Sequence, residues 1–198
     1  MRTDPITRDA IVPTLLAVGL GHRGPGLFTL ELAPGYLGWL GLNRAWEHDG
    51  GGELRLRPVV GVRHQETERI AADCCGLKMH GFLPATICRP LGRVWDFSEE
   101  HATDVARDMA AAIASEGLAF MHAHTTLAKL LEGIERGLGP LDEALAVRRP
   151  IVLSLMHAPE RARDVLDQEL ARLSGRTDRA AEFYRYFAAA FRKRLPPG

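Results

Sequence analysis

The stretch ELRLRPVVGVR, residues 53–63, decides the class of fold. Leucine alternates with arginine over residues 54–57. Such alternation is typical of a strand with one face against a core and the other in water. Two further strand-like stretches precede it, LFTLEL (27–32) and YLGWLGLNRAW (36–46). The sequence therefore predicts several half-buried strands in its first half.

Turn residues separate these three stretches. APG (33–35) and HDGGG (48–52) are short and rich in glycine, so we expect hairpins and an antiparallel sheet. Residues 85–97 are strand-like as well, and predict a fourth strand or a long extended segment.

Helical periodicity marks most of the remaining chain. Residues 5–18 and HQETERIAADCCG (64–76) each predict a helix, the second ending at Gly76. We expect Ser98 to cap a helix that ends at Gly117. The later expected elements are a helix through 120–137, a strand or helix start at PIVLSLMH (150–157), and helices over 159–173 and 178–194. The last of these helices should bury Ala180, Phe183, Phe187 and Phe191.

Strands in a run followed by helices in a run predict an α+β fold. We expect an antiparallel sheet of about four strands flanked by helices, with a helical C-terminal half. The 198 residues are expected to form one domain (1–198), sheet-rich over 25–97 and helix-rich over 98–198.

Composition narrows the class of partner. The formal net charge is zero and 25% of residues are charged, which indicates neither a nucleic-acid nor a membrane partner. The apolar run AIVPTLLAVGLG (10–21) is too short to cross a bilayer and lacks a positively charged leader. Three cysteines cannot all pair, which favours a cytoplasmic location.

Three stretches together resemble a family of uncharacterised bacterial α+β proteins. They are GWLGLNRAW (38–46), LRLRPVVGVRHQETERIAA (54–72) and RVWDF (93–97). The family carries a domain-of-unknown-function label and is similar in texture to immunity-type and toxin-neighbourhood proteins. The resemblance covers about residues 25–120. It implies an α+β domain that binds another macromolecule, and it brings no catalytic residues.

The stretch DCCGLKMHG (73–81) is the first candidate metal site. Adjacent cysteines on a helix diverge by about 100°, so Cys74 and Cys75 do not share a metal as a C-x-x-C pair does. We expect Cys74 to be a buried apolar residue. A site of Cys75, His80 and Cys88 requires the following loop to fold back. We expect no metal and no cofactor.

Other chemical motifs are weak. GLGHRG (19–24) matches G-x-G-x-x-G, but Pro25 and Gly26 follow where the dinucleotide motif needs a helix, so we expect a loop. His122 and His124 share a face on a strand but not on the helix expected there. The chain has no H-E-x-x-H, Walker or G-x-S-x-G motif.

One group of residues is typical of a binding surface. Arginine and tryptophan, which dominate interface hot spots, occur at the ends of the predicted strands. The group comprises Asn43, Arg44, Trp46, Arg63, His64, Arg89, Arg93 and Trp95. The same pattern also fits a solvated sheet face with arginine stems over apolar rings.

Two functions follow from this group. The first is a non-catalytic protein of immunity or regulatory type that binds another protein, as a monomer or weak homodimer. The alternative is an enzyme or small-ligand binder acting on a phosphate- or carboxylate-bearing substrate. Its pocket would contain Arg44, Arg63, His64 and Arg89, with His64 as acid or base.

Overall fold

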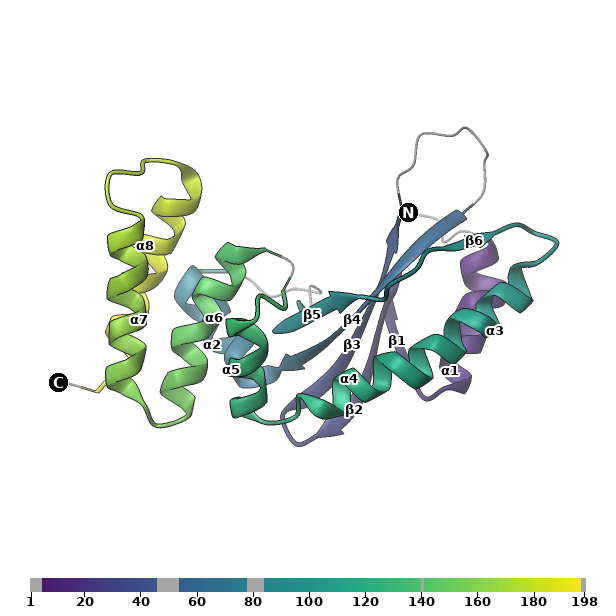
Figure 1. Ribbon diagram of the computed structural model, residues 1–198, viewed down its shortest axis with the longest axis horizontal. Coiled ribbons are helices and arrows are strands. Elements are labelled where there is room, and N and C mark those ends of the chain that lie inside the picture. Colours follow the sequence, from purple (N-terminus) through teal and green to yellow (C-terminus); the bar gives the residue numbers. More distant parts are fainter. Residues whose placement is uncertain (1–4, 46–53, 78–83, 140, 197–198) are drawn as a thin grey trace. The chain divides into compact units, whose positions relative to one another are not determined.

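The computed structural model describes residues 5–45, 54–77, 84–139 and 141–196. Their strands form one sheet in the order β1-β2-β3-β4-β5, and β6 pairs with β4 (Figure 1). The strands are β1 (Gly21–Gly24), β2 (Leu27–Ala33), β3 (Tyr36–Arg44), β4 (Leu54–His64), β5 (Ile87–Pro90) and β6 (Trp95–Phe97). The predicted combination of helices with an antiparallel sheet is confirmed, with six strands in the described ranges in place of about four.

Strand β4 shows the expected alternation in its first half. Leu54 and Leu56 are buried, whereas Arg57 is exposed. From Val60 to Arg63 every residue is buried. The charged side chain of Arg63 therefore does not lie on a wet face of the sheet.

The extended segment predicted over 85–97 consists of two strands. Between β5 and β6, the backbone N–H of Leu91 donates to the carbonyl of Pro58 at 2.9 Å. Strand β6 then runs antiparallel to β4, where Arg55 lies opposite Asp96 and forms an ion pair with it.

The GLGHRG stretch contains a strand, so the loop predicted there is wrong. Residues Gly21–Gly24 form β1, which pairs antiparallel with β2. Gly26, at φ +68°, turns the chain directly into β2. No helix follows to offer its N-terminus to a pyrophosphate, which is what the dinucleotide motif requires.

The chain divides into two compact units. The first comprises Met1–Val62 and Cys88–Ala123, and the second comprises Arg63–Ile87 and His124–Gly198. Strands β4 and β5 each contribute residues to both units. The division does not follow the predicted sheet-rich and helix-rich ranges, and the single domain stays a prediction.

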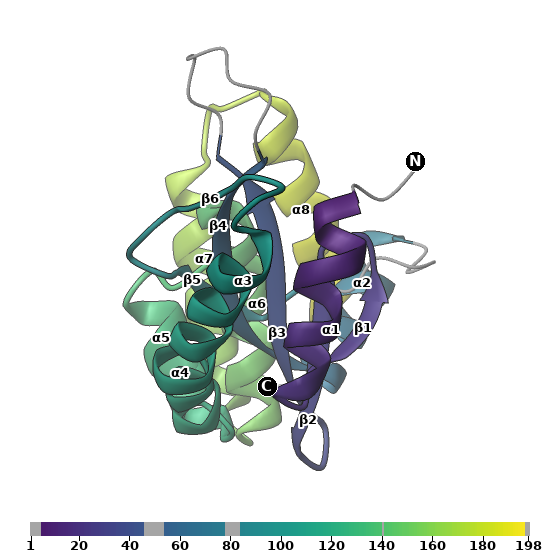
Figure 2. The same cartoon turned by 90° about the vertical axis from the view of Figure 1, so that its right-hand side faces the viewer.

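Helices of the first unit cover its strands. They are η1 (Thr7–Ile11, π-helical), α1 (Val12–Ala17), α3 (Ala102–Ala112), η2 (Ile113–Gly117, π-helical) and α4 (Leu118–Ala123). Helix α1 contacts β1 and α3, and α4 contacts β3 (Figure 2).

Two predicted boundaries in this unit are wrong. Helix α3 begins at Ala102 rather than after Ser98, whose carbonyl accepts from the N–H of His101 at 3.3 Å in a preceding turn. Gly117 does not end the helical run, which continues into α4. A Cβ at Gly117 would lie 3.0 Å from Cγ1 of Val60, so the glycine serves close packing against β4.

The described elements of the second unit, apart from the strand ends, are helices. They are α2 (Gln65–Cys75), α5 (Leu127–Glu135), α6 (Asp142–Leu155), α7 (Pro159–Arg172) and α8 (Arg179–Arg192). Helix α6 contacts α2, α5, α7 and α8, and α8 also contacts α2 (Figure 1). Helix α2 ends as predicted, at Gly76 in the left-handed conformation.

Three sequence-based expectations for this part of the chain need correction. The helix expected over 120–137 is two helices, because the side chain of Thr126 caps α5 by accepting from the N–H of Lys129 at 3.2 Å. The stretch 150–157 lies mostly within α6 rather than forming a strand or starting a helix. In α8, Phe187 and Phe191 are buried as expected, whereas Phe183 is 37% exposed and Ala180 is only half-buried.

No helix in the described part of the chain combines the length and apolarity needed to cross a membrane.

Candidate functional site

The predicted binding residues are divided between the two units. Asn43 and Arg44 are exposed at the end of β3. Trp46 lies outside the described residues. Arg63 and His64 belong to the second unit, whereas Arg89, Arg93 and Trp95 belong to the first.

Arg93 and Trp95 do come together, around Asp108 of α3. The Arg93 guanidinium lies 4.4 Å from the centroid of the Trp95 ring. Trp95 Nε1 and Arg93 Nη2 each donate to Asp108 Oδ2 at 2.8 Å. The bond from Trp95, followed by that from Arg93, lowers the pKa of Asp108. This arrangement attaches β6 to α3, and Trp95 itself is buried.

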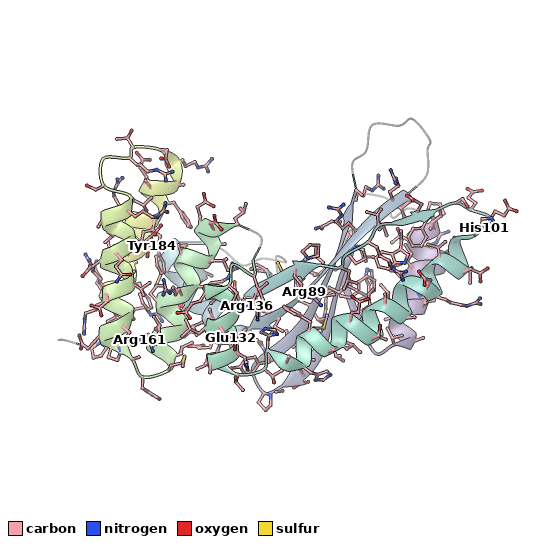
Figure 3. The ribbon with its side chains drawn as sticks, viewed as in Figure 1. Arg89, His101, Glu132, Arg136, Arg161 and Tyr184 are labelled. Atoms are coloured by element: carbon pink, nitrogen blue, oxygen red, sulfur yellow. The ribbon has the colours of Figure 1, made fainter. Side chains whose placement is uncertain are left out.

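Arg89 is also engaged within the first unit. Its guanidinium lies 5.1 Å from the centroid of the Phe120 ring (Arg89 is labelled in Figure 3). Such a contact is a cation–π interaction. Arg89 and Arg93 thus lie against aromatic rings, as expected if the predicted group is structural.

A pocket in the second unit is the strongest candidate site. One wall is a single face of α2, formed by Glu68, Ala71, Ala72 and Cys75. Their i, i+3, i+4, i+7 spacing places them next to one another on the helix surface. The opposing wall is a face of α6 built from Ala144, Val147 and Arg148 at the same spacing, preceded by Leu141.

Small side chains create this space. Two alanines and a cysteine on α2 face an alanine and a valine on α6, so the two walls do not fill the volume between them. The cavity measures about 270 Å³. This volume is close to that of the smaller ligand-binding pockets of proteins, which begin at roughly 300 Å³. We call it the α2–α6 pocket. It is lined by Glu68, Ala71, Ala72, Cys75, Leu77, Pro84, Leu141, Glu143, Ala144, Val147, Arg148 and Phe183.

The polar groups of the pocket form a buried ion pair. Arg148 Nε donates to Glu68 Oε1 at 2.7 Å, and Nη2 donates to Oε2 at 2.9 Å. The side chains are 7% and 2% exposed. This bidentate geometry is the strong form of an arginine–carboxylate contact.

Groups from β4 and the chain before β5 complete the network. Thr86 Oγ1 donates to Glu68 Oε1 at 2.8 Å and accepts from the backbone N–H of His64 at 2.9 Å. Arg63 Nη1 donates to the carbonyl of Pro84 at 2.9 Å. Burial lowers the pKa of Arg63, while Glu68 raises it and Arg148 lowers it further.

His64 has a structural position at the start of α2. Its side chain caps the helix: Nδ1 accepts from the N–H of Thr67 at 3.4 Å and lies 2.8 Å from Thr67 Oγ1. Burial lowers its pKa, against opposing effects of Glu66 and Glu68. His64 does not line the pocket, so the predicted role as acid or base receives no support from its position.

The cysteines of DCCGLKMHG are free thiols, as is Cys88. Cys74 is buried, as expected. Cys75 lines the α2–α6 pocket, and burial followed by the neighbouring Cys74 raises the pKa of its thiol to about 11. The thiol is therefore protonated at neutral pH and is a poor nucleophile. His80 lies outside the described residues.

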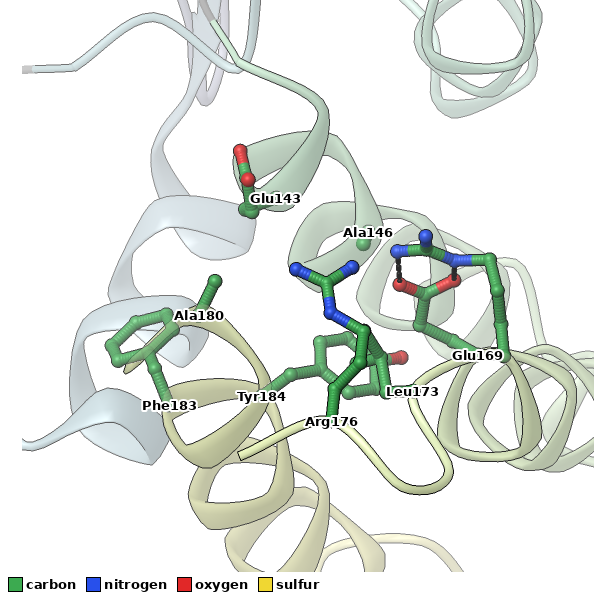
Figure 4. A pocket seen from close by; sticks show the side chains of 9 residues that line it. Glu143, Ala146, Glu169, Leu173, Arg176, Ala180, Phe183 and Tyr184 are labelled. Carbon is green, nitrogen blue, oxygen red and sulfur yellow. Dashed lines mark hydrogen bonds and ion pairs between the residues drawn. The ribbon is translucent and has the colours of Figure 1, made fainter. Parts of the chain in front are cut away.

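A second hollow of this unit is much smaller. It lies among α6, α7 and α8 and measures about 20 Å³ (Figure 4). That volume is comparable to the space one water molecule occupies. Its walls include the buried ring of Tyr184 and the ion pair of Glu169 with Arg172. The α2–α6 pocket is therefore the better candidate for an organic ligand.

Among the described residues, no three His, Cys, Asp or Glu side chains gather as a metal site. Exposed carboxylates instead pair with cations, as Glu132 does with Arg136 at 3.6 Å on α5 (Figure 3).

Sequence reasoning missed Glu68 and Arg148. They are 80 residues apart, so no local motif joins them. A signal was present on each helix: one charged residue occupies a position on an otherwise apolar face, and the two charges are opposite.

Comparisons with known proteins do not assign the chain to a family. No family model matches the chain, and neither a curated protein nor a solved structure is significantly similar to it. The resemblance to immunity-type proteins therefore stays a prediction.

Proposed function

We propose that the protein binds a small organic molecule in the α2–α6 pocket. The observation that carries this proposal is the cavity itself, about 270 Å³ between two helix faces of alanine, valine and cysteine. Ligand sites are mostly apolar with a few placed polar groups, and this pocket combines apolar walls with one buried ion pair.

Exposed apolar side chains in the lining of the pocket support the same function. Leu77, Leu141 and Phe183 line it and are 56%, 65% and 37% exposed. Exposed large apolar side chains cost free energy in water, and a ligand that covers them recovers part of that cost.

Ligand size follows from the volume. An engineered cavity of about 150 Å³ binds benzene, so by proportion this pocket accommodates roughly eleven non-hydrogen atoms. An aromatic ring with a short polar tail is of that size.

The experiment is titration calorimetry with hydrocinnamyl alcohol, a neutral compound of this size. We expect wild-type binding and at least about tenfold weaker binding to Ala144→Trp, since the indole occupies the pocket. The control is Ala171→Trp, at an exposed position of α7 that does not line the pocket. Equal affinity of all three proteins, or no binding to any, contradicts the proposal.

Protein binding is the second function, predicted from the sequence. The exposed guanidinium of Arg93, stacked on Trp95, is the part of the predicted group best placed to meet a partner. Arg63 is buried and unsuited to that role. A pull-down that compares wild type with Arg93→Glu tests it, and retention of the same proteins by both baits argues against it.

We also infer a cytoplasmic setting, which the three free thiols support. The expected monomer or weak homodimer is checked by light scattering at micromolar concentration.

A further inference from the structure

We propose that the ligand of the α2–α6 pocket is a monocarboxylate, whose carboxylate accepts a hydrogen bond from Nη1 of Arg148. This inference rests on the proposed function and adds the chemical class of the ligand.

The first observation is an unused donor. Arg148 employs Nε and Nη2 on Glu68, and its Nη1 is buried without a hydrogen-bond partner in the described structure. The side chain is 7% exposed and lines the pocket. A buried donor without an acceptor costs free energy, so a ligand that supplies an acceptor gains affinity there.

The second observation is the balance of buried charge. Among the described residues, the charged side chains that are buried are Arg63, Glu68 and Arg148. Two guanidinium groups and one carboxylate give this buried group a net positive charge, to which Arg63 contributes from outside the pocket lining. Glu143, which also lines the pocket, is exposed, and water screens its charge.

This balance favours one negative charge on the ligand. A monocarboxylate neutralises the group, whereas a phosphate dianion would overcompensate it. Glu68 occupies the Nε–Nη2 edge of Arg148, so Nη1 is the nitrogen that is left for the ligand. Cys75 is a protonated thiol and brings no charge.

The apolar walls determine the chemical character of the part of the ligand outside the carboxylate. Ala72, Leu77, Val147 and Phe183 offer no charged group to a second polar substituent. We therefore expect an aromatic or short aliphatic body of about eight non-hydrogen atoms behind the carboxylate.

The experiment uses four compounds of one shape with the wild-type protein at pH 7.5. They are hydrocinnamate, its amide, its alcohol and the corresponding amine. A hydrogen bond between two charged groups is stronger than one to a neutral acceptor, so we expect hydrocinnamate to bind at least about tenfold more tightly than the amide or alcohol. The amine should bind most weakly.

Two variants test whether Arg148 causes the preference for the acid. Glu68→Leu/Arg148→Met replaces the ion pair with apolar side chains and removes the Nη1 donor, so it should lose most of the preference for the acid over the amide. Arg149→Met removes the neighbouring charge on α6, which pairs with Glu135 outside the pocket, and should keep the preference. If the double variant does not fold, the wild-type series still decides.

Different results would contradict the carboxylate assignment and the proposed function. Equal binding of acid, amide and alcohol, or tighter binding of the amine or of a phosphate ester of the alcohol, overturns the carboxylate assignment and leaves the pocket as a ligand site. An absence of binding by all compounds overturns both proposals.

Discussion

Glu68 holds together the buried polar groups of the second unit. Its two oxygens accept three hydrogen bonds, two from Arg148 and one from Thr86. A buried charge is tolerated only when it is paired and hydrogen-bonded, so each of these groups depends on the carboxylate.

We expect Glu68→Gln to lower the free energy of unfolding by about 3 kcal/mol, because it leaves the guanidinium of Arg148 buried without a counter-charge. Glu68→Leu/Arg148→Met should recover most of that loss, since it removes both charges. Urea unfolding followed by far-ultraviolet circular dichroism measures both.

The matched control is Glu132→Gln on α5. Glu132 pairs with Lys129 and Arg136 at the surface, where ion pairs contribute little, so this variant should unfold close to wild type. If Glu68→Gln is no more damaging than Glu132→Gln, the buried pair does not have the role assigned to it.

At the scale of the element, helix α2 depends on the protonation of its N-cap. His64 accepts from the N–H of Thr67 through Nδ1, which it can do only when that nitrogen carries no proton. Its pKa is lowered in the folded state by burial, so the unfolded chain binds the proton more readily. Stability is therefore complete above the unfolded pKa of about 6.5 and decreases as pH falls below it.

We expect His64→Asn to remove this dependence, because asparagine caps a helix without titrating. The measurement is the unfolding midpoint in urea at several pH values between 7 and 5, taken as the difference between wild type and variant so that other groups cancel. The wild type should lose more stability than the variant toward pH 5. Parallel curves would show that the cap does not titrate in this range.

The elements that sequence predicted correctly are those with a local pattern. In these elements the hydrophobic pattern and the flanking turn residues lie within a dozen positions of one another. They are β2, β3, β4 and α2. The break at Thr126 was missed because the apolar helical period continues on both sides of it, and the cap is a single hydroxyl.

The continuation through Gly117 was missed for a different reason. Glycine usually indicates a helix end, but here it allows contact with Val60 of β4, a tertiary effect with no local sign. The candidate site escaped prediction in the same way, since its two walls come from helices far apart in sequence. Arg63 was predicted as a binding residue from its position in a strand, and its burial depends on packing that alternation does not report.

At the scale of the whole molecule, tryptophan fluorescence separates the two units. Trp39 and Trp95 belong to the first unit, and the ranges of the second contain no tryptophan. Circular dichroism, in contrast, reports the helices of both.

We expect Glu68→Gln to shift the fluorescence and circular dichroism transitions equally, as in a single cooperative domain. The physical reason is that β4 is one continuous strand with residues in both units. Wild-type curves from the two probes are the control. A shift confined to circular dichroism would show that the second unit unfolds by itself, against the predicted single domain.

The separation of Glu68 from Arg148 also matters while the protein is being made. A ribosome adds about 5–20 residues per second, so the 80 residues between them take roughly 4–16 s to synthesise. During that interval the nascent chain holds a carboxylate on the future pocket face of α2 whose partner does not yet exist. That helix face must remain hydrated until α6 has been synthesised, so the α2–α6 pocket cannot assemble before that helix has left the ribosome.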